Sequence, residues 1–235
     1  MDFQNRHVVV TGGTGALGTA VVGTLLAAGA VCHVPYYSEE EAKRFAHRHR
    51  NHKQVSLVPL GNLADEPAVT AFYGGLNTLW ASIHIAGGFA FAPIAQSDKS
   101  LLTGQLESNL ISAYLCSRAA VAAFRRGPGP GRIVNVAARQ ALEPRLGASL
   151  TAYTVSKAGL AALTVALAEE VAQEGILVNA VAPSIMDTPA NRNSMPKADF
   201  DAWPKVEEVA ATIVFLASPQ NAVTRGAVVP AYGKV

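Results

Sequence analysis

Tyr153 and Lys157 are the two side chains whose types and spacing best suit acid–base chemistry. They are four residues apart in the segment LTAYTVSKAG, so on a helix they share one face. A neighbouring ammonium favours a phenolate, and it therefore lowers the pKa of a tyrosine from its ordinary value of about 10. Tyr153 would then exchange protons near neutral pH. The alternative is a surface pair with no chemical role, which the spacing alone does not exclude.

A glycine-rich turn, TGGTGALG at residues 11–18, lies between an apolar strand and a helix. Gly12 and Gly15 permit a tight turn and a close approach of the backbone, and Gly18 lets the helix pack closely. A turn in this place directs backbone N–H groups and a helix N-terminus at one point, where a pyrophosphate binds favourably. The turn predicts a dinucleotide site, and a strand–helix turn without a ligand is the alternative.

The elements that must position these residues alternate along the chain. Apolar, β-branched runs predict strands at His7–Thr11, Val31–Val34, Val55–Leu60, Leu79–Ile85, Arg132–Val136, Ile176–Val181 and Ala227–Pro230. Helical periodicity predicts helices at Ala16–Ala28, after Ser38, and at Glu66–Tyr73, Leu101–Phe124, Tyr153–Gln173 and Glu207–Ala217. This alternation indicates one α/β domain over residues 1–235, with a doubly wound parallel sheet and helices on both faces.

The chain resembles the short-chain dehydrogenase/reductase family over essentially its full length. The motifs that carry the resemblance occur in one order: Thr11–Gly18, Ala86-Gly87, Asn109, Tyr153-x-x-x-Lys157 and Pro183–Pro189. The resemblance implies a Rossmann-type domain that binds NAD(H) or NADP(H). The implied cofactor contacts are Gly12, Thr14, Gly15, Ala16, Leu17, Tyr36, Asn62, Leu63, Ala86, Gly87, Tyr153, Lys157, Pro183 and Thr188.

The resemblance also implies catalytic roles. Tyr153 would be the acid/base, and Lys157 would lower its pKa and hold the nicotinamide ribose. Asn109 would maintain a helix kink and a water-linked proton path, while Thr188 would contact the carboxamide. Ala138 departs from the family, which usually has a serine there to hydrogen-bond the reacting oxygen; losing such a donor costs roughly 10²–10³ in rate. The other departures are Ala16, Asn62, His84 and Ser184.

Three segments are similar to dihydropteridine reductases within this family. They are GTGALG at 13–18, AGGF at 86–89 and DTPANRNSMPKADF at 187–200. Those enzymes also lack the serine, and hydride addition to a C=N system builds less negative charge on a carbonyl oxygen. The resemblance therefore implies a small carbonyl or C=N substrate, imine or quinonoid, with pterins among the candidates.

The sequence leaves two classes of function open. The first is an NAD(P)H-dependent oxidoreductase. The second is a non-catalytic NAD(P)-binding regulator derived from such an enzyme, which the loss of the serine at Ala138 suggests. Retention of Tyr153, Lys157 and Asn109 favours the enzyme, because a binding protein needs no acid/base.

Cofactor choice normally depends on the residue at the end of the second strand, an acid for NAD or an arginine for NADP. Here the segment VPYYS at 34–38 has neither. Without an acid there is no repulsion of the 2′-phosphate, so the sequence leans to NADP(H). The basic run 43–53 either supplies a side chain or is a solvated helix and loop.

Residues 184–204 predict a substrate lid, because prolines and large apolar side chains follow a strand end without periodicity. The predicted substrate pocket comprises Ala138, Gln140, Phe89 and Met186. Gln140, Ser149 and Thr151 are the candidates to replace the missing hydroxyl.

Composition excludes several classes of protein. With 50% hydrophobic residues and a net charge of +2, the chain is neither disordered nor suited to nucleic acid. Its histidines lack metal-ligand spacing, and we expect no metal site. Cys32 and Cys116 predict buried thiols. No apolar stretch reaches the roughly 18 residues of a membrane span, and the N-terminus lacks a signal peptide, which predicts a cytoplasmic protein. The alanine-rich helices Leu101–Phe124 and Tyr153–Gln173 predict a homodimer or homotetramer.

Overall fold

The computed structural model describes residues 1–49 and 52–235, and its seven strands form one parallel sheet in the order β3-β2-β1-β4-β5-β6-β7. The order reverses between β1 and β4, so the loops after these two neighbours turn to opposite faces and leave a crevice at the carboxyl ends. The strands are β1 (His7–Thr11), β2 (Val31–Tyr36), β3 (Val55–Pro59), β4 (Ala81–His84), β5 (Arg132–Val136), β6 (Leu177–Pro183) and β7 (Val228–Ala231).

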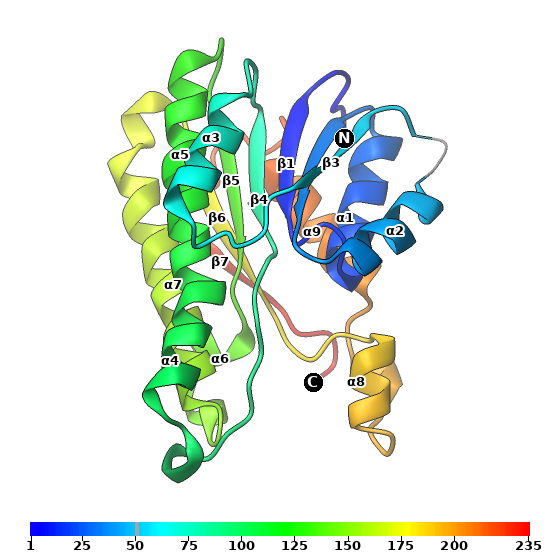
Figure 1. Ribbon diagram of the computed structural model, residues 1–235, viewed down its shortest axis with the longest axis vertical. Coiled ribbons are helices and arrows are strands. Elements are labelled where there is room, and N and C mark those ends of the chain that lie inside the picture. Colours follow the sequence, from blue (N-terminus) through cyan, green and yellow to red (C-terminus); the bar gives the residue numbers. More distant parts are fainter. Residues whose placement is uncertain (50–51) are drawn as a thin grey trace.

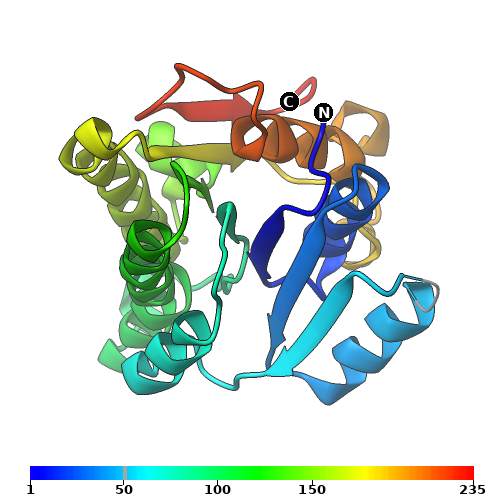
Figure 2. The same cartoon turned by 90° about the horizontal axis from the view of Figure 1, so that it is seen from above.

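Helices cover both faces of the sheet, as Figure 2 shows. One face carries α1 (Ala16–Ala27), α2 (Glu39–Arg48) and α9 (Val206–Ala217), and the other carries α3 (Glu66–Gly74), α4 (Lys99–Leu106), α5 (Ser112–Arg126) and α7 (Thr151–Glu170). Two short helices, α6 (Arg139–Leu142) and α8 (Pro189–Ser194), lie beyond the carboxyl ends of the strands (Figure 1). The predicted doubly wound α/β fold is therefore confirmed.

Each face of the sheet has its own apolar core. One cluster joins β1 and β2 to α1 and α9, and the other joins β5 and β6 to α3, α5 and α7. Cys32 and Cys116 are buried free thiols in these clusters, and burial raises the pKa of each to about 12. The prediction of buried thiols is confirmed.

Two predicted elements differ from the structure. The single helix predicted at Leu101–Phe124 is interrupted by a π-helical turn, Glu107–Ile111, between α4 and α5. The strand predicted to end before Pro35 continues to Tyr36. Pro35 is tolerated because β1 pairs with β2 only as far as His33, so no β1 neighbour faces Pro35, which pairs with Val58 of β3 alone.

The expectation that no apolar stretch is long enough to span a membrane is wrong, because one helix has the length and the composition. Among the described residues, the 20-residue α7 passes that test by length and composition, because alanines raise its mean hydropathy to 1.2. In the fold, α7 packs on β6 and against α4 and α6, as a core helix does. Its apolar character is thus accounted for by packing.

A chain of hydrogen bonds crosses the core through His84. Asn135 donates from Nδ2 to Thr164 Oγ1 at 2.9 Å, so its Oδ1 accepts from His84 Nδ1 at 2.8 Å. His84 Nε2 then accepts from Ser82 Oγ at 2.8 Å, and Tyr73 donates to Ser82 at 2.7 Å. This direction requires a neutral imidazole, and complete burial lowers the pKa of His84 to about 4.

We expect acid to destabilise the protein through His84. Its pKa is about 4 in the fold and 6.5 when unperturbed, so the unfolded chain binds more protons between these values. The stabilisation of the fold by neutral His84 is fully present above pH 6.5, and it declines by about 3 kcal/mol as the pH falls to 4. Urea unfolding at several pH values should show that the free energy of unfolding declines less steeply with falling pH in His84→Asn, which keeps a donor and an acceptor. The exposed His47→Asn is the control, and an unchanged slope in His84→Asn would contradict the assignment.

Candidate active site

The glycine turn brings the backbone of β1 against the backbone that follows β4. Gly12 has a φ of +67°, and a Cβ there would lie 2.6 Å from the amide nitrogen of Ala86. A Cβ on Gly18 would lie 2.1 Å from the carbonyl oxygen of Gly12. Both positions require glycine, the first for its conformation and its contact and the second for its contact alone.

The N-terminus of α1 follows β1 at the carboxyl ends of the strands, where the crevice is expected. Gly15 is its N-cap residue and supplies no side-chain cap, so the N–H groups of the first turn keep their donor capacity. Backbone donors and the helix dipole at this point fit the pyrophosphate of a dinucleotide. The residues present therefore suit a nicotinamide dinucleotide, with the turn at its phosphates.

Asn109 joins three segments from its position in the π-helical turn. Its Oδ1 accepts from Gly88 N at 3.1 Å, and its Nδ2 donates to Gly88 O at 2.9 Å and to Ser156 Oγ at 3.1 Å. The same Nδ2 also lies 3.3 Å from Gln105 Oε1. The buried amide thus holds the loop after β4 against α4 and α7, and the π turn supplies the irregular backbone that the family resemblance implies at this residue.

Lys157 and Tyr153 lie on the same side of α7, as their spacing predicts. Lys157 is buried and donates from Nζ to the carbonyl oxygen of Val136, at the end of β5, over 2.7 Å. The Tyr153 ring meets the ring of Phe89 edge to face, with centroids 5.1 Å apart. Desolvation lowers the pKa of Lys157 to about 8 and raises that of Tyr153 to about 12.

The expected lowering of the pKa of Tyr153 by Lys157 is therefore wrong for this chain. Burial disfavours the phenolate, and the Lys157 ammonium is directed at Val136. Spacing along the helix places the two side chains on one face, but it does not determine how much water each one loses.

Two cavities meet at Tyr153. The inner one, of about 210 Å³, reaches Gly87, Asn109 and Lys157. The outer one, of about 770 Å³, opens toward α8 and is lined by Phe91, Gln140, Leu150 and Ile185 among others. The residues that line both are Phe89, Ala138, Tyr153, Pro183, Ser184 and Met186. A group bound in one cavity would therefore contact a group bound in the other beside the Tyr153 ring.

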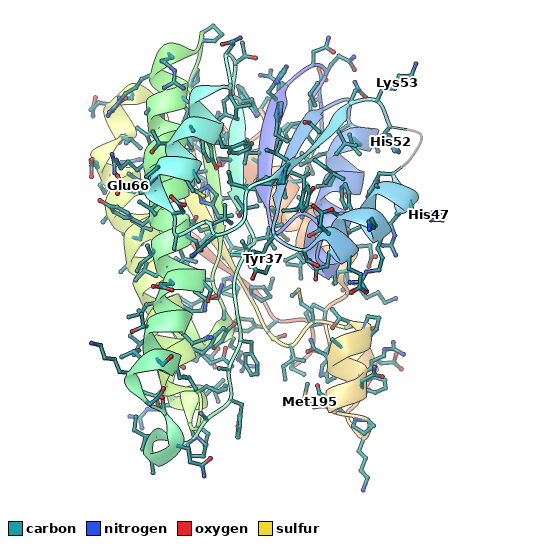
Figure 3. The ribbon with its side chains drawn as sticks, viewed as in Figure 1. Tyr37, His47, His52, Lys53, Glu66 and Met195 are labelled. Atoms are coloured by element: carbon teal, nitrogen blue, oxygen red, sulfur yellow. The ribbon has the colours of Figure 1, made fainter. Side chains whose placement is uncertain are left out.

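The predicted lid forms one wall of the outer cavity. Ala190, Asn191, Ser194 and Met195 line it, and Figure 3 shows Met195 beside α8. Asp187 and Arg192 hold the helix with hydrogen bonds of 2.6 and 2.8 Å. Trp203, at the end of the predicted segment, is buried and its ring contacts the ring of Phe200.

Several predicted cofactor residues lie away from the inner cavity. Thr188 uses its hydroxyl to cap α8, accepting from Asn191 N at 3.2 Å. Asn62 accepts from Ala64 N in an exposed turn, and Leu63 packs on the core beside α3. Tyr36 lies at the end of β2 and donates to Glu39. The described residues that line the two cavities do not include Thr188, Asn62, Leu63 or Tyr36.

The three candidates to replace the missing hydroxyl lie at different places. Gln140 lines the outer cavity, whereas Ser149 and Thr151 are not among the described lining residues. Ser184 lines both cavities, but its Oγ donates to the carbonyl oxygen of Tyr232 at 2.8 Å. Leu150 lines the outer cavity one helical turn before Tyr153 and was not predicted as a pocket residue, although that spacing is visible in the sequence. Ile185 and Asn191 line it from within the predicted lid segment, 184–204.

The chain belongs to the short chain dehydrogenase family, which matches residues 6–199. With the glycine turn at the crevice, this membership makes the protein an NAD(P)-dependent oxidoreductase of the short-chain dehydrogenase/reductase class. No group of three or more His, Cys, Asp or Glu side chains that would hold a metal ion occurs in the described part of the chain.

Similar proteins cover nearly all of this chain. A galactitol 2-dehydrogenase from Rhizobium johnstonii is 32% identical over 97% of this chain and 93% of its own. A 2,3-dihydroxy-2,3-dihydro-p-cumate dehydrogenase from Pseudomonas putida is 27% identical, covering 99% and 95%. The crystal structure of a putative gluconate dehydrogenase from Agrobacterium tumefaciens has a TM-score of 0.88 at 26% identity, covering 99% and 96%.

Replacing Gly12 by alanine should remove dinucleotide binding and destabilise the fold. Gly226→Ala is the matched control, because Gly226 has a φ of +66° but only an ordinary contact, at 3.7 Å. We expect about 1 kcal/mol of destabilisation from positive φ alone and at least about 2 kcal/mol where the new Cβ also meets the Ala86 backbone. Urea unfolding and NADH fluorescence titration measure the two effects. Normal NADH binding by Gly12→Ala would contradict the placement of the turn.

Proposed function

We propose that this protein reduces a small, uncharged carbonyl or C=N compound, with Tyr153 as the proton donor. The observation that carries the proposal is the position of Tyr153, whose ring lines both the inner and the outer cavity. The inner cavity, lined by Gly87, Asn109 and Lys157, would hold the nicotinamide, which would supply the hydride in its reduced form. The substrate occupies the outer cavity, so its reacting atom lies beside the phenol.

Tyr153 is prepared to give a proton. With a pKa of about 12 it is protonated throughout the neutral range, as a donor in the reductive direction must be. Its proton moves to the substrate oxygen or nitrogen as the hydride adds to the adjacent carbon. Lys157 positions α7 through its hydrogen bond to Val136, and its ammonium would hold the nicotinamide ribose.

The outer cavity supports an uncharged and largely apolar substrate. Its described lining contains no Asp, Glu, Lys, Arg or His side chain, and its walls come mainly from Phe89, Phe91, Leu150, Ile185 and Met195. Burial of an unpaired charge there is costly. Gln140, Asn191 and Ser194 supply the hydrogen-bonding groups that orient a substrate.

The absence of a hydroxyl at residue 138 distinguishes the two bond types. Reduction of a carbonyl builds negative charge on oxygen, which a second donor stabilises, whereas a C=N nitrogen becomes an amine. A quinonoid pterin is a candidate within the second type. The galactitol and dihydrodiol dehydrogenases are named for hydroxyl-bearing substrates, which keeps the carbonyl–alcohol couple as the other candidate.

A binding protein without catalysis is the second candidate, and Ala138 is the observation that favours it. Against it, Tyr153, Lys157 and Asn109 are all held in position by packing or hydrogen bonds. Such a regulator would need no proton donor between its two cavities.

We also propose that the protein self-associates through α5 and α7. An apolar groove of about 480 Å³ lies there, with Gly159, Ala162 and Ala166 permitting close approach of a second copy. Ile111 and Tyr114 are exposed at its edge although they are large and apolar. A twofold pairing of this face would bury them.

Tyr153→Phe should lower kcat/KM for the active substrate by a factor of about 10²–10⁴ and leave NADH binding within about twofold, because the variant loses the proton donor and keeps the ring. Stopped-flow absorbance of the reduced nicotinamide and fluorescence titration give the two values. Tyr114→Phe is the matched control, because it removes a hydroxyl that lies outside both cavities and keeps the ring. Unchanged turnover by Tyr153→Phe would remove Tyr153 from the mechanism. A wild-type protein that is inactive on every ketone, diketone, cyclic imine and quinonoid pterin would instead support the non-catalytic NAD(P)-binding regulator.

Ala138→Ser should separate the carbonyl from the C=N substrate. Ala138 precedes α6 with an extended backbone, a position that serine occupies readily, so the variant should fold. With ketones, the new hydroxyl should raise kcat by about 10-fold or more. With cyclic imines or quinonoid pterin, we expect less than about threefold change. A uniform effect on both substrate types would show that the missing donor does not determine the bond reduced.

A further inference from the structure

The first turn of α2 carries three successive carboxylates beside the nucleotide crevice. Ser38 caps this helix by accepting from Glu41 N, and the next three residues are Glu39, Glu40 and Glu41. A helix N-terminus favours such side chains, so the turn explains their presence on α2 but not where each one points. The three point to different partners.

Two of the three reach residues of the nucleotide site. Glu41 Oε2 accepts a 3.0 Å hydrogen bond from Thr14 Oγ1 in the glycine turn. Glu39 Oε1 accepts a 2.9 Å hydrogen bond from the phenol of Tyr36 at the end of β2. Glu40 instead pairs with Arg44 at 3.3 Å and is largely exposed. The turn therefore contains two carboxylates aimed at the site and one that is not.

Thr14 and Tyr36 lie on the two elements that hold the pyrophosphate and the adenosine ribose in a nucleotide-binding unit of this kind, the glycine turn and the end of β2. The glycine turn holds the pyrophosphate, and the end of the second strand lies beside the ribose hydroxyls. An acidic side chain at that point accepts from the 2′-hydroxyl of NAD, whereas NADP has a phosphate there. In this chain the end of β2 has no acid, but α2 directs Glu39 at Tyr36 there and Glu41 at Thr14 in the adjoining glycine turn.

The charge at this place is unfavourable for a 2′-phosphate. Among the described residues, no ion pair neutralises Glu39 or Glu41. A phosphate monoester carries about −1.5 to −2 charges at neutral pH, and it would lie against these carboxylates. Repulsion of the wrong partner selects as effectively as attraction of the right one.

We propose that Glu41, supported by Glu39 through Tyr36, makes the protein prefer NAD(H) over NADP(H). This reverses the lean to NADP(H) that follows from the residues of β2 alone, because the carboxylates come from the next element. The inference rests on the nucleotide site of the proposed function and is independent of the catalytic role of Tyr153.

Calorimetric titration of the full-length protein with NAD⁺ and NADP⁺ tests the proposal without turnover. The wild-type protein should bind NAD⁺ at least about tenfold more tightly than NADP⁺. Glu41→Gln should reduce this ratio by about tenfold, through tighter NADP⁺ binding and weaker NAD⁺ binding. Glu39→Gln should reduce it by about threefold, because Glu39 acts through Tyr36.

Glu40→Gln is the matched control, since it removes the same charge from the same turn without touching the nucleotide site. Its ratio of dissociation constants should stay within about twofold of wild type. Tighter binding of NADP⁺ by the wild type, or an equal change in Glu40→Gln and Glu41→Gln, would overturn the proposal.

The outcomes also separate this inference from the proposed function. A wild type that turns over substrate but prefers NADP⁺ defeats the inference alone. Normal turnover by Tyr153→Phe, with the expected Glu41→Gln shift, defeats the catalytic assignment alone. Failure to bind either dinucleotide would defeat both.

Discussion

The hydrogen bond from Lys157 Nζ to the carbonyl oxygen of Val136 is the contact on which the arrangement of the site depends. It joins α7 to the end of β5 inside the protein, where water does not compete for the ammonium. One helical turn earlier, Tyr153 is thereby held at the junction of the two cavities. The same burial that strengthens this bond lowers the pKa of Lys157 and raises that of Tyr153, so position and protonation state have one physical cause.

Asn109 and the glycine turn complete the frame around this contact. Asn109 satisfies both backbone groups of Gly88, which forms part of the inner cavity, and it does so from a turn where the regular helix is interrupted. Gly12 and Gly18 let the backbones of β1, α1 and the loop after β4 approach more closely than any side chain permits. Residues from segments far apart in the sequence are thus held together by contacts to the backbone.

Much of the fold was predictable because it follows from local patterns. The alternation of apolar strands and helices, the cap at Ser38 and the spacing of Tyr153 and Lys157 all depend on neighbours along the chain, and the structure has the corresponding elements. The local pattern failed at Pro35 and in the helix around Asn109, where only the family resemblance implied an irregular backbone. The tolerance of Pro35 depends on where β1 stops pairing, and the interruption depends on contacts to Gly88 and Ser156; neither is visible within a local window.

By itself, the sequence determined the class of fold, the dinucleotide turn and the residues available for proton transfer, because periodicity and glycine spacing act over a few residues. Tertiary structure decided which of those residues meet. It placed Thr188 at the N-cap of α8 and Glu41 against Thr14. It also raised the pKa of Tyr153 to about 12, whereas the spacing from Lys157 implied a lowered pKa. These outcomes depend on burial and on distances between remote segments, and both come into existence only when the sheet and its helices pack together.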